Sequence, residues 1–240
     1  MRIVIIRHGE PDYDHDSLTE QGWKEAELLS DRIAKMDVTD IYVSPLGRAR
    51  DTASLTLKKI GRTAETLDWL QEFQPRIIRP DLNERSIAWD WLPEDWMDAP
   101  IFFDPDHWFD QPVMAEAGVK EKYQWIIQNF DQLLKKYGYE RDGRYYHVVK
   151  ESHDTIVLFC HFGVECVLLS RIFNVSPMVL WHGFAAAPSS VTILNSEERR
   201  QGRAVFRMSE FGDISHLYAG GKEPSFMTRF CECYSDKTRH

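Results

Sequence analysis

Cysteine is scarce in this chain, which argues against a protein held together by disulfides. Four cysteines occur in 240 residues, at positions 160, 166, 231 and 233, too sparse for a disulfide framework. A reducing, cytoplasmic location is therefore expected. Cys231 and Cys233, with His240 nearby, could form half of a metal site, but no second pair accompanies them and no metal is predicted.

Long apolar runs and positive charge are also lacking. No stretch approaches the ~18 uninterrupted apolar residues of a membrane span, and the first apolar run, which Arg7 interrupts, is too short for a signal peptide. The 29 basic residues against 38 acidic ones give a formal net charge of −9. Such a field repels nucleic acids and anionic membranes, so neither is an expected partner. An anionic ligand would need a local cationic pocket.

Short apolar runs alternate with helical patterns along most of the chain. Strands are expected at residues 2–6, 41–43, 63–67, 155–160, 191–194 and 204–208, with a polar turn-forming segment over 195–202. Helices are expected at residues 18–36, 44–60, 119–137, 163–173 and from 176, and Ser44-Pro45 and Ser176-Pro177 are expected to cap two of them. This alternation predicts a single domain over 1–240 with a three-layer α/β/α fold and a mostly parallel central sheet.

One segment, residues 85–120, shows no hydrophobic period and is rich in tryptophan, proline and aspartate. We expect an irregular, lid-like insertion there, because long loops in compact domains are often lids or binding loops. Its tryptophans, at positions 89, 91, 96 and 108, fit a satellite core and a ligand surface equally well.

Basic side chains and histidines follow the predicted strands at the points where these end. Arg7 and His8 follow the first strand, His161 follows the strand over 155–160, and Arg48 lies in the first turn of the helix after the second strand. Ligands of open α/β sheets bind beyond the carboxyl ends of the strands, so these four side chains should converge.

The chemistry of this set predicts a site for a phosphate dianion. Helix starts near Ser44 and Gly163 would add backbone N–H groups to it. A neutral His8 could attack phosphorus, while a protonated His161 and the arginines stabilise charge on the phosphoryl oxygens. Phosphoryl transfer needs mainly positioning and charge neutralisation, so no metal or cofactor is required. Arg48 could instead pair with Asp51 on its own helix.

Four stretches resemble motifs of the histidine phosphatase superfamily, the phosphoglycerate mutase-like enzymes. They are RHGE at 7–10, LTEQGWKEA at 18–26, SPLGRARDTA at 44–53 and FCHFG at 159–163. The resemblance implies a phosphohistidine intermediate on His8, a phosphate pocket of Arg7, Arg48, His161 and Gly163, and a carboxylic acid that protonates the leaving oxygen and later activates water.

Two glutamates could be that acid. Glu72, in WLQEF, lies 24 residues after Arg48 and is similar to the Leu-x-Glu turn of the family. Glu84, in DLNERS, lies 36 residues after Arg48, and this stretch resembles the Leu-Asn-Glu-Arg motif of the mutases. We favour Glu72 and keep Glu84 as the alternative.

The sequence therefore predicts a metal-independent phosphatase that acts on a small phosphorylated substrate. A phosphoglycerate mutase is the alternative enzyme, supported by LNER at 82–85. A catalytically silent module that binds a phosphorylated ligand is the alternative outside enzymes. No pattern in the sequence indicates an oligomeric state.

Overall fold

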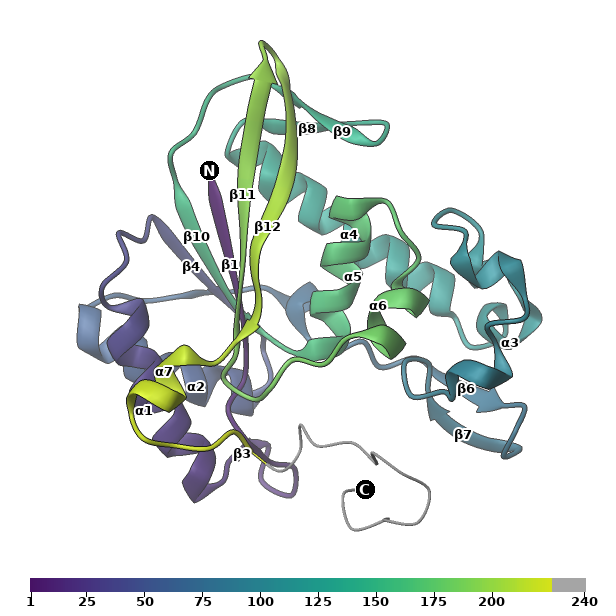
Figure 1. Cartoon of the computed structure of the whole chain (residues 1–240), viewed down its shortest axis with the longest axis horizontal. Coiled ribbons are helices and arrows are strands. Elements are labelled where there is room, and N and C mark those ends of the chain that lie inside the picture. Colours follow the sequence, from purple (N-terminus) through teal and green to yellow (C-terminus); the bar gives the residue numbers. More distant parts are fainter. Residues whose placement is uncertain (226–240) are drawn as a thin grey trace.

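A mixed sheet of eight strands forms the centre of the protein in the computed structural model, which describes residues 1–225 (Figure 1). The predictions on Cys231, Cys233 and His240 lie outside these residues. The strands are β1 (Arg2–Arg7), β2 (Pro11–Asp12), β3 (Ser17–Leu18), β4 (Asp40–Val43), β5 (Glu65–Thr66), β6 (Arg76–Arg79), β7 (Glu84–Ile87), β8 (Tyr139–Asp142), β9 (Tyr145–Val148), β10 (Thr155–Cys160), β11 (Val191–Arg200) and β12 (Arg203–Asp213). The α-helices are α1 (Glu20–Ile33), α2 (Gly47–Ile60), α3 (Pro112–Ala115), α4 (Val119–Lys136), α5 (Phe162–Phe173), α6 (Pro177–Gly183) and α7 (Ser215–Ala219).

The sheet has a parallel half and an antiparallel half. Its order is β5-β4-β10-β1-β11-β12-β9-β8, and the first four strands run parallel to one another. From β1 onward each neighbour is antiparallel. The predicted α/β fold is thus confirmed, with the parallel strands in the half that carries the sequence motifs.

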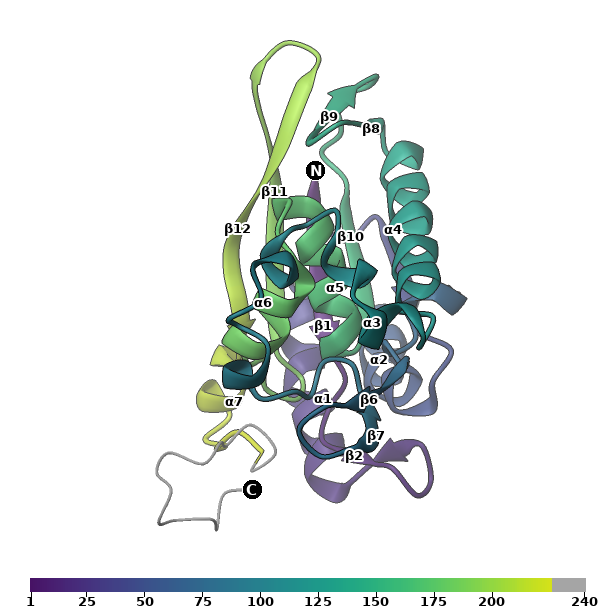
Figure 2. The ribbon, with the colours of Figure 1, turned by 90° about the vertical axis from the view of Figure 1, so that its right-hand side faces the viewer.

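Helices cover both faces of the sheet, which makes three layers (Figures 1 and 2). Alternate residues of β1 point to opposite faces: Ile3 and Ile5 belong to the core cluster that includes α4, α5 and α6, whereas Val4 and Ile6 belong to the cluster with α1 and α2. A strand buried on both faces reads as a continuous apolar run, which is why β1 and β10 were predictable from sequence.

The polar segment 195–202 is not the turn that we expected. β11 continues to Arg200, and only Gln201 and Gly202 turn the chain into β12. This distal part of the hairpin projects from the sheet (Figure 1). The Arg207–Glu197 ion pair links its two strands (2.6 Å). β9 pairs with β12 only opposite residues 203 and 204.

A second correction concerns the start of α2. The helix begins at Gly47 with Leu46 as its N-cap, and the expected cap, Ser44, lies outside it. The prediction for Ser176 is confirmed, since its side chain accepts a hydrogen bond from the Met178 N–H at the start of α6 (3.2 Å).

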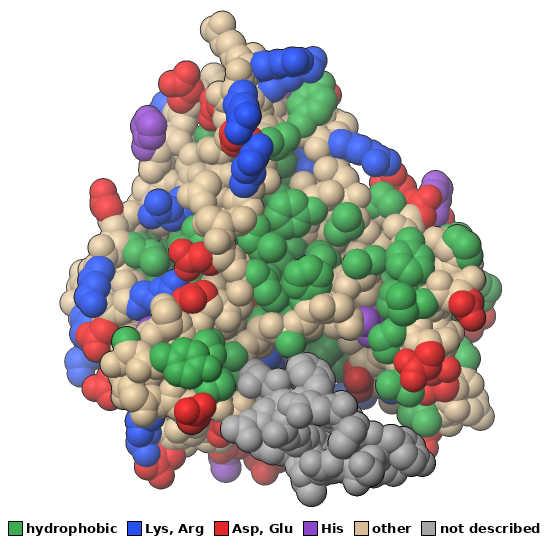
Figure 3. All heavy atoms as spheres, viewed as in Figure 1, with side chains coloured by type: hydrophobic (Ala, Val, Ile, Leu, Met, Phe, Trp, Pro, Cys, Tyr) green, Lys and Arg blue, Asp and Glu red, His purple; other side chains and the backbone are tan. Residues whose placement is uncertain are grey.

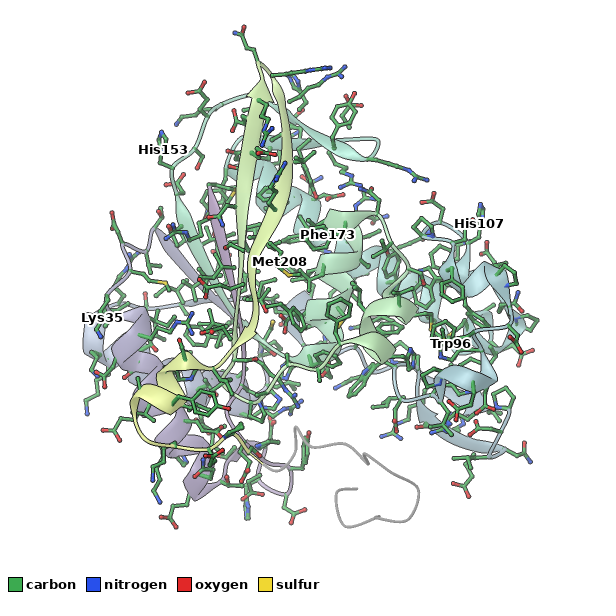
Figure 4. All side chains as sticks on the ribbon, in the orientation of Figure 1. Lys35, Trp96, His107, His153, Phe173 and Met208 are labelled. Atoms are coloured by element: carbon green, nitrogen blue, oxygen red, sulfur yellow. The ribbon has the colours of Figure 1, made fainter. Side chains whose placement is uncertain are left out.

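Residues 85–120 contain little regular structure. The segment begins in the β6–β7 hairpin and continues through the 3₁₀ turns η2 (Pro93–Asp95), η3 (Pro100–Phe103) and η4 (Trp108–Asp110) to α3. Three of its tryptophans, 91, 96 and 108, are buried and belong to the main core cluster. Figure 4 labels Trp96 within this part of the molecule. The Trp108 ring packs edge-on against Trp181 of α6, at 5.4 Å between centroids, so these rings form core rather than ligand surface.

No helix among residues 1–225 combines the length and apolar character needed to cross a membrane.

Candidate active site

The two motif histidines meet at the carboxyl edge of the parallel strands. β1 and β10 are neighbours in register, with Arg7 opposite Cys160, so the residues that follow each strand also lie side by side. The His8 N–H donates to the Cys160 carbonyl (3.0 Å), and the imidazole rings of His8 and His161 lie 5.1 Å apart. The predicted convergence of these residues is what the structure shows.

His8 is buried and electrically neutral at neutral pH. Burial is the main cause that lowers the pKa of its imidazole well below the ordinary value, and the nearby Arg7 and Arg48 lower it further. Its Nδ1 lies 2.7 Å from the Gly9 carbonyl oxygen. Because a carbonyl can only accept, Nδ1 carries the proton and Nε2 keeps its lone pair for attack.

Gly9 of the RHGE motif allows the chain to pass close to α1. A Cβ at this position would lie 2.8 Å from the carbonyl oxygen of Gly22, which no side chain can tolerate without movement. The Gly9 N–H donates to Thr52 Oγ1 of α2 (2.9 Å). The loop after β1 is therefore fixed by both helices on that face of the sheet.

The two arginines approach the histidines from different elements. The buried Arg7 guanidinium donates to the Ala186 carbonyl and lies 5.9 Å from the Phe162 ring. Arg48 donates to Asp16 Oδ1 (2.7 Å), so the alternative pair with Asp51 does not form.

Each guanidinium keeps a donor free. Within residues 1–225 the Nε atoms of Arg7 and Arg48 are buried without a hydrogen-bond partner. Buried donors without partners are costly, and an anion between these side chains would satisfy them.

His161 occupies the N-cap position of α5, and its Nε2 is hydrogen-bonded to the Ser44 hydroxyl (2.8 Å). We expected a protonated His161, but burial, followed by the influence of His8, Arg48 and Arg7, lowers its pKa well below the ordinary value. His161 is therefore neutral in the ligand-free protein. A bound dianion would oppose this shift.

Glu72 reaches this edge of the sheet and Glu84 does not. The Glu72 carboxylate accepts the backbone N–H groups of Phe73 (2.7 Å), Val164 (2.9 Å) and Gly163 (3.2 Å). Burial nevertheless outweighs these bonds and raises its pKa. Glu84 is exposed at the start of β7. The Gly163 N–H, which we expected to face phosphate, is thus bound to Glu72.

Two acids at the site were not predicted from the sequence. Asp16 binds both Arg48 and the Gly47 N–H (2.6 Å), and so serves as a distant cap for α2. Glu165, in the first turn of α5, is 1% exposed, and burial raises its pKa to about 7. An acid within the apolar run FGVECVLL was a visible signal for Glu165, whereas no local pattern marks Asp16.

No group of three or more His, Cys, Asp or Glu side chains suited to a metal ion occurs in the described part of the chain.

The family model described as histidine phosphatase superfamily (branch 1) matches residues 3–207. The chain is 40% identical over 221 residues to the serine/threonine-protein phosphatase Pgam5, mitochondrial, of Caenorhabditis elegans. This match covers 90% of this chain and 63% of that protein. It is 32% identical over 73 residues to a 2,3-bisphosphoglycerate-dependent phosphoglycerate mutase of Thermoplasma acidophilum, covering 26% of this chain and 36% of that protein. The chain thus spans less than two thirds of the length of either relative. Since the first of them is named as mitochondrial, a cytoplasmic location remains a prediction.

Solved structures show the same fold. A phosphoserine phosphatase of Entamoeba histolytica in complex with 3-phosphoglyceric acid superposes with a TM-score of 0.57 at 17% identity, over 90% of this chain and 98% of that one. A mycobacterial glucosyl-3-phosphoglycerate phosphatase has a TM-score of 0.55 at 19% identity, over 88% and 98%.

Proposed function

This chain belongs to the histidine phosphatase superfamily, and on that premise we propose that it hydrolyses a small phosphomonoester through a phosphohistidine on His8. The observation that carries the proposal is the neutral His8, whose ring centroid lies 5.1 Å from that of His161 and which is close to Arg7 and Arg48, two arginines with buried Nε donors that lack a partner among residues 1–225. A nucleophile without charge beside fixed positive charge suits attack on a phosphate dianion.

In the first step the lone pair of His8 Nε2 attacks phosphorus and the bond from phosphorus to the leaving oxygen breaks. The protonated Glu72 carboxyl gives its proton to that oxygen, which departs as an alcohol. Arg7, Arg48 and His161 stabilise the charge on the three other oxygens. In the second step Glu72, now a carboxylate, takes a proton from water; the resulting hydroxyl oxygen bonds to phosphorus, the bond to Nε2 breaks, and inorganic phosphate leaves.

Opposite pKa shifts favour this division of roles. Burial lowers the pKa of His8 and raises that of Glu72. Each shift favours the reactive form of its group, which is the neutral imidazole for His8 and the protonated carboxyl for Glu72. A bell-shaped dependence of kcat/KM on pH is expected.

The insertion contributes one side chain next to the acid. Trp89 donates its indole N–H to the Phe73 carbonyl (2.8 Å), and its ring lies 6.2 Å from the Phe162 ring. This contact supports residues 85–120 as the lid-like cover over the leaving-group side of the site. Phosphoserine and glucosyl-3-phosphoglycerate, named for the structural neighbours, are phosphomonoesters of the class we propose.

The test is phosphate release from a panel of small phosphomonoesters without added metal. His8→Ala should lose turnover and should not become labelled on nitrogen by a radioactive phosphomonoester. Glu72→Gln should lower kcat by about 10²–10⁴-fold, whereas its matched control, Glu84→Gln, should stay within about twofold. Normal turnover in His8→Ala would refute the proposal. If Glu84→Gln lowered kcat and Glu72→Gln did not, Glu84 would be the general acid instead of Glu72.

Phosphoglycerate mutase activity remains the second candidate because of the partial match to a mutase. Its sequence signature, LNER at 82–85, lies on an exposed turn of the β6–β7 hairpin. A coupled assay with 2- and 3-phosphoglycerate, with and without a bisphosphate primer, distinguishes the two enzymes. Phosphate binding without any phosphoenzyme would instead support the silent binding module.

A further inference from the structure

A single loop, residues 186–190, holds the backbone and side chain of the Arg7–His8 pair. The Ala186 carbonyl accepts from the Arg7 guanidinium, and the Ser190 carbonyl accepts the Arg7 N–H (3.1 Å). The Ser189 N–H donates to the carbonyl of His8 (2.9 Å). The position of the proposed nucleophile thus depends directly on the conformation of this loop.

Ser189 has a backbone conformation that costs free energy. Its φ is 61°, in the left-handed region where L side chains are disfavoured, and it is fully buried. Such residues persist only where the surroundings hold them. The contact that holds this one is a hydrogen bond between Ser189 Oγ and Nε2 of His216 (3.1 Å).

His216 belongs to α7, the last helix among residues 1–225, which is itself anchored. Its imidazole is buried, and Arg32 of α1 fixes the start of the helix by binding Asp213 and the Ser215 hydroxyl (3.3 Å). Arg32 also pairs with Glu210 (2.6 Å). His216 is therefore presented to Ser189 by a helix that Arg32 connects to α1.

The same C-terminal segment contacts the other end of the RHGE motif. The Ser225 hydroxyl donates to Glu10 Oε2, and Glu10 Oε1 accepts from the Thr19 hydroxyl (2.7 Å). Residues 215–225 thus reach the RHGE motif directly through Ser225 and indirectly through the contact of His216 with Ser189, whose N–H binds the His8 carbonyl.

We propose that His216 is a positioning residue, which acts through Ser189 to hold the His8 backbone in the geometry that phosphoryl transfer requires. This inference rests on the proposed role of His8 as the nucleophile. It assigns to α7 a function in catalysis besides its packing against α1.

The kinetic test uses p-nitrophenyl phosphate and four variants. Ser189 is hydrogen-bonded to the His8 carbonyl and is not one of the residues proposed to bind phosphate. Ser189→Ala and His216→Leu should therefore each lower kcat about tenfold and leave inhibition by inorganic phosphate within about twofold. His216→Gln, which can still hydrogen-bond the hydroxyl, should recover most of the activity. The double variant Ser189→Ala/His216→Leu should be no slower than either single variant, because both remove one interaction.

The matched control is His153→Leu, which removes an exposed histidine that precedes β10 (labelled in Figure 4), whereas His161 follows the other end of that strand. It should leave kcat unchanged. Unchanged kcat in Ser189→Ala and His216→Leu, or additive losses in the double variant, would overturn the inference, as would a loss that merely follows the unfolded fraction measured by circular dichroism.

A second readout needs no turnover. The imidazole nitrogen signals of His8 in NMR spectra should shift or broaden in Ser189→Ala and His216→Leu, but not in His153→Leu. Identical His8 signals in all variants would refute the positioning role. Absence of phosphatase activity in the unaltered protein would refute the proposed function, and the NMR comparison would still decide this inference.

Discussion

Glu165 gives a quantitative prediction, because folding transfers its carboxyl from water into the protein interior. The side chain is 1% exposed, and Oε1 has no hydrogen-bond partner among residues 1–225. Burial raises its pKa from 4.5 to about 7, against the opposing effects of Thr192 and Arg7. The charged form is thus disfavoured in the folded state.

The sign of the pH effect follows from the raised pKa. Between pH 4.5 and about 7 the folded protein holds a proton that the unfolded chain has released, so stability falls as pH rises through this interval. A gap of about 2.5 between the two pKa values corresponds to about 3 kcal/mol of unfolding free energy at pH 8. At pH 5 the same calculation gives less than about 1 kcal/mol.

The perturbation is Glu165→Gln, which keeps the shape of the side chain and cannot ionise. The free energy of unfolding can be measured by urea titration, followed by tryptophan fluorescence, at pH 5 and at pH 8. The variant should gain about 2–3 kcal/mol in this free energy relative to the unaltered protein between the two pH values. Glu27→Gln, at an exposed position of α1, is the matched control and should show no such trend. A difference for Glu165→Gln that stays constant with pH would refute the reasoning.

Three further changes test the site and the core. In Gly163→Ala, a Cβ would lie 2.5 Å from Glu72 Oε1; displacement of the acid should lower kcat about 10²-fold for an alkyl phosphate but less for p-nitrophenyl phosphate, whose leaving group needs little protonation. Asp16→Ala removes the partner that orients Arg48 and should raise KM several-fold in steady-state assays, while an unchanged KM would show that the ion pair is dispensable. Trp108→Ala empties a fully buried position and should lower the free energy of unfolding by about 3–5 kcal/mol in urea titrations; a loss below about 1 kcal/mol would show that the insertion does not share the core.

The sequence predicted best where local pattern and topology coincide. β1 and β10 are buried on both faces, so each reads as a continuous apolar run. Because ligands bind beyond the carboxyl ends of parallel strands, the sequence alone predicted that His8 and His161 lie close together. Glu72 was favoured by spacing, but its bonds to the start of α5 depend on the path of a loop. No periodicity describes such a path.

The failures have the same origin. Ser44-Pro45 has the local form of a helix cap, yet the Ser44 hydroxyl binds His161, which is 117 residues away in the sequence. The polar stretch after Asn195 lacked alternation because the distal hairpin has no core beneath it, and its strands are held by cross-strand pairing. The contact of Asp16 with Arg48 and the Gly47 N–H joins residues about 30 positions apart, so no local pattern predicts it.

The projecting β11–β12 hairpin has a consequence for association between molecules. Beyond residue 204 the outer edge of β12 has no strand partner within the described chain. Apolar side chains gather beside this hairpin (Figure 3). On β12 itself, the Phe211 ring packs on Phe184, with 5.1 Å between the centroids. A free strand edge of this length is a template for aggregation. Its pairing with β11 shifts register three times, and the charged Arg207 and Glu210 interrupt the edge. The register shifts and the charged side chains of this hairpin therefore oppose edge-to-edge pairing with a second chain.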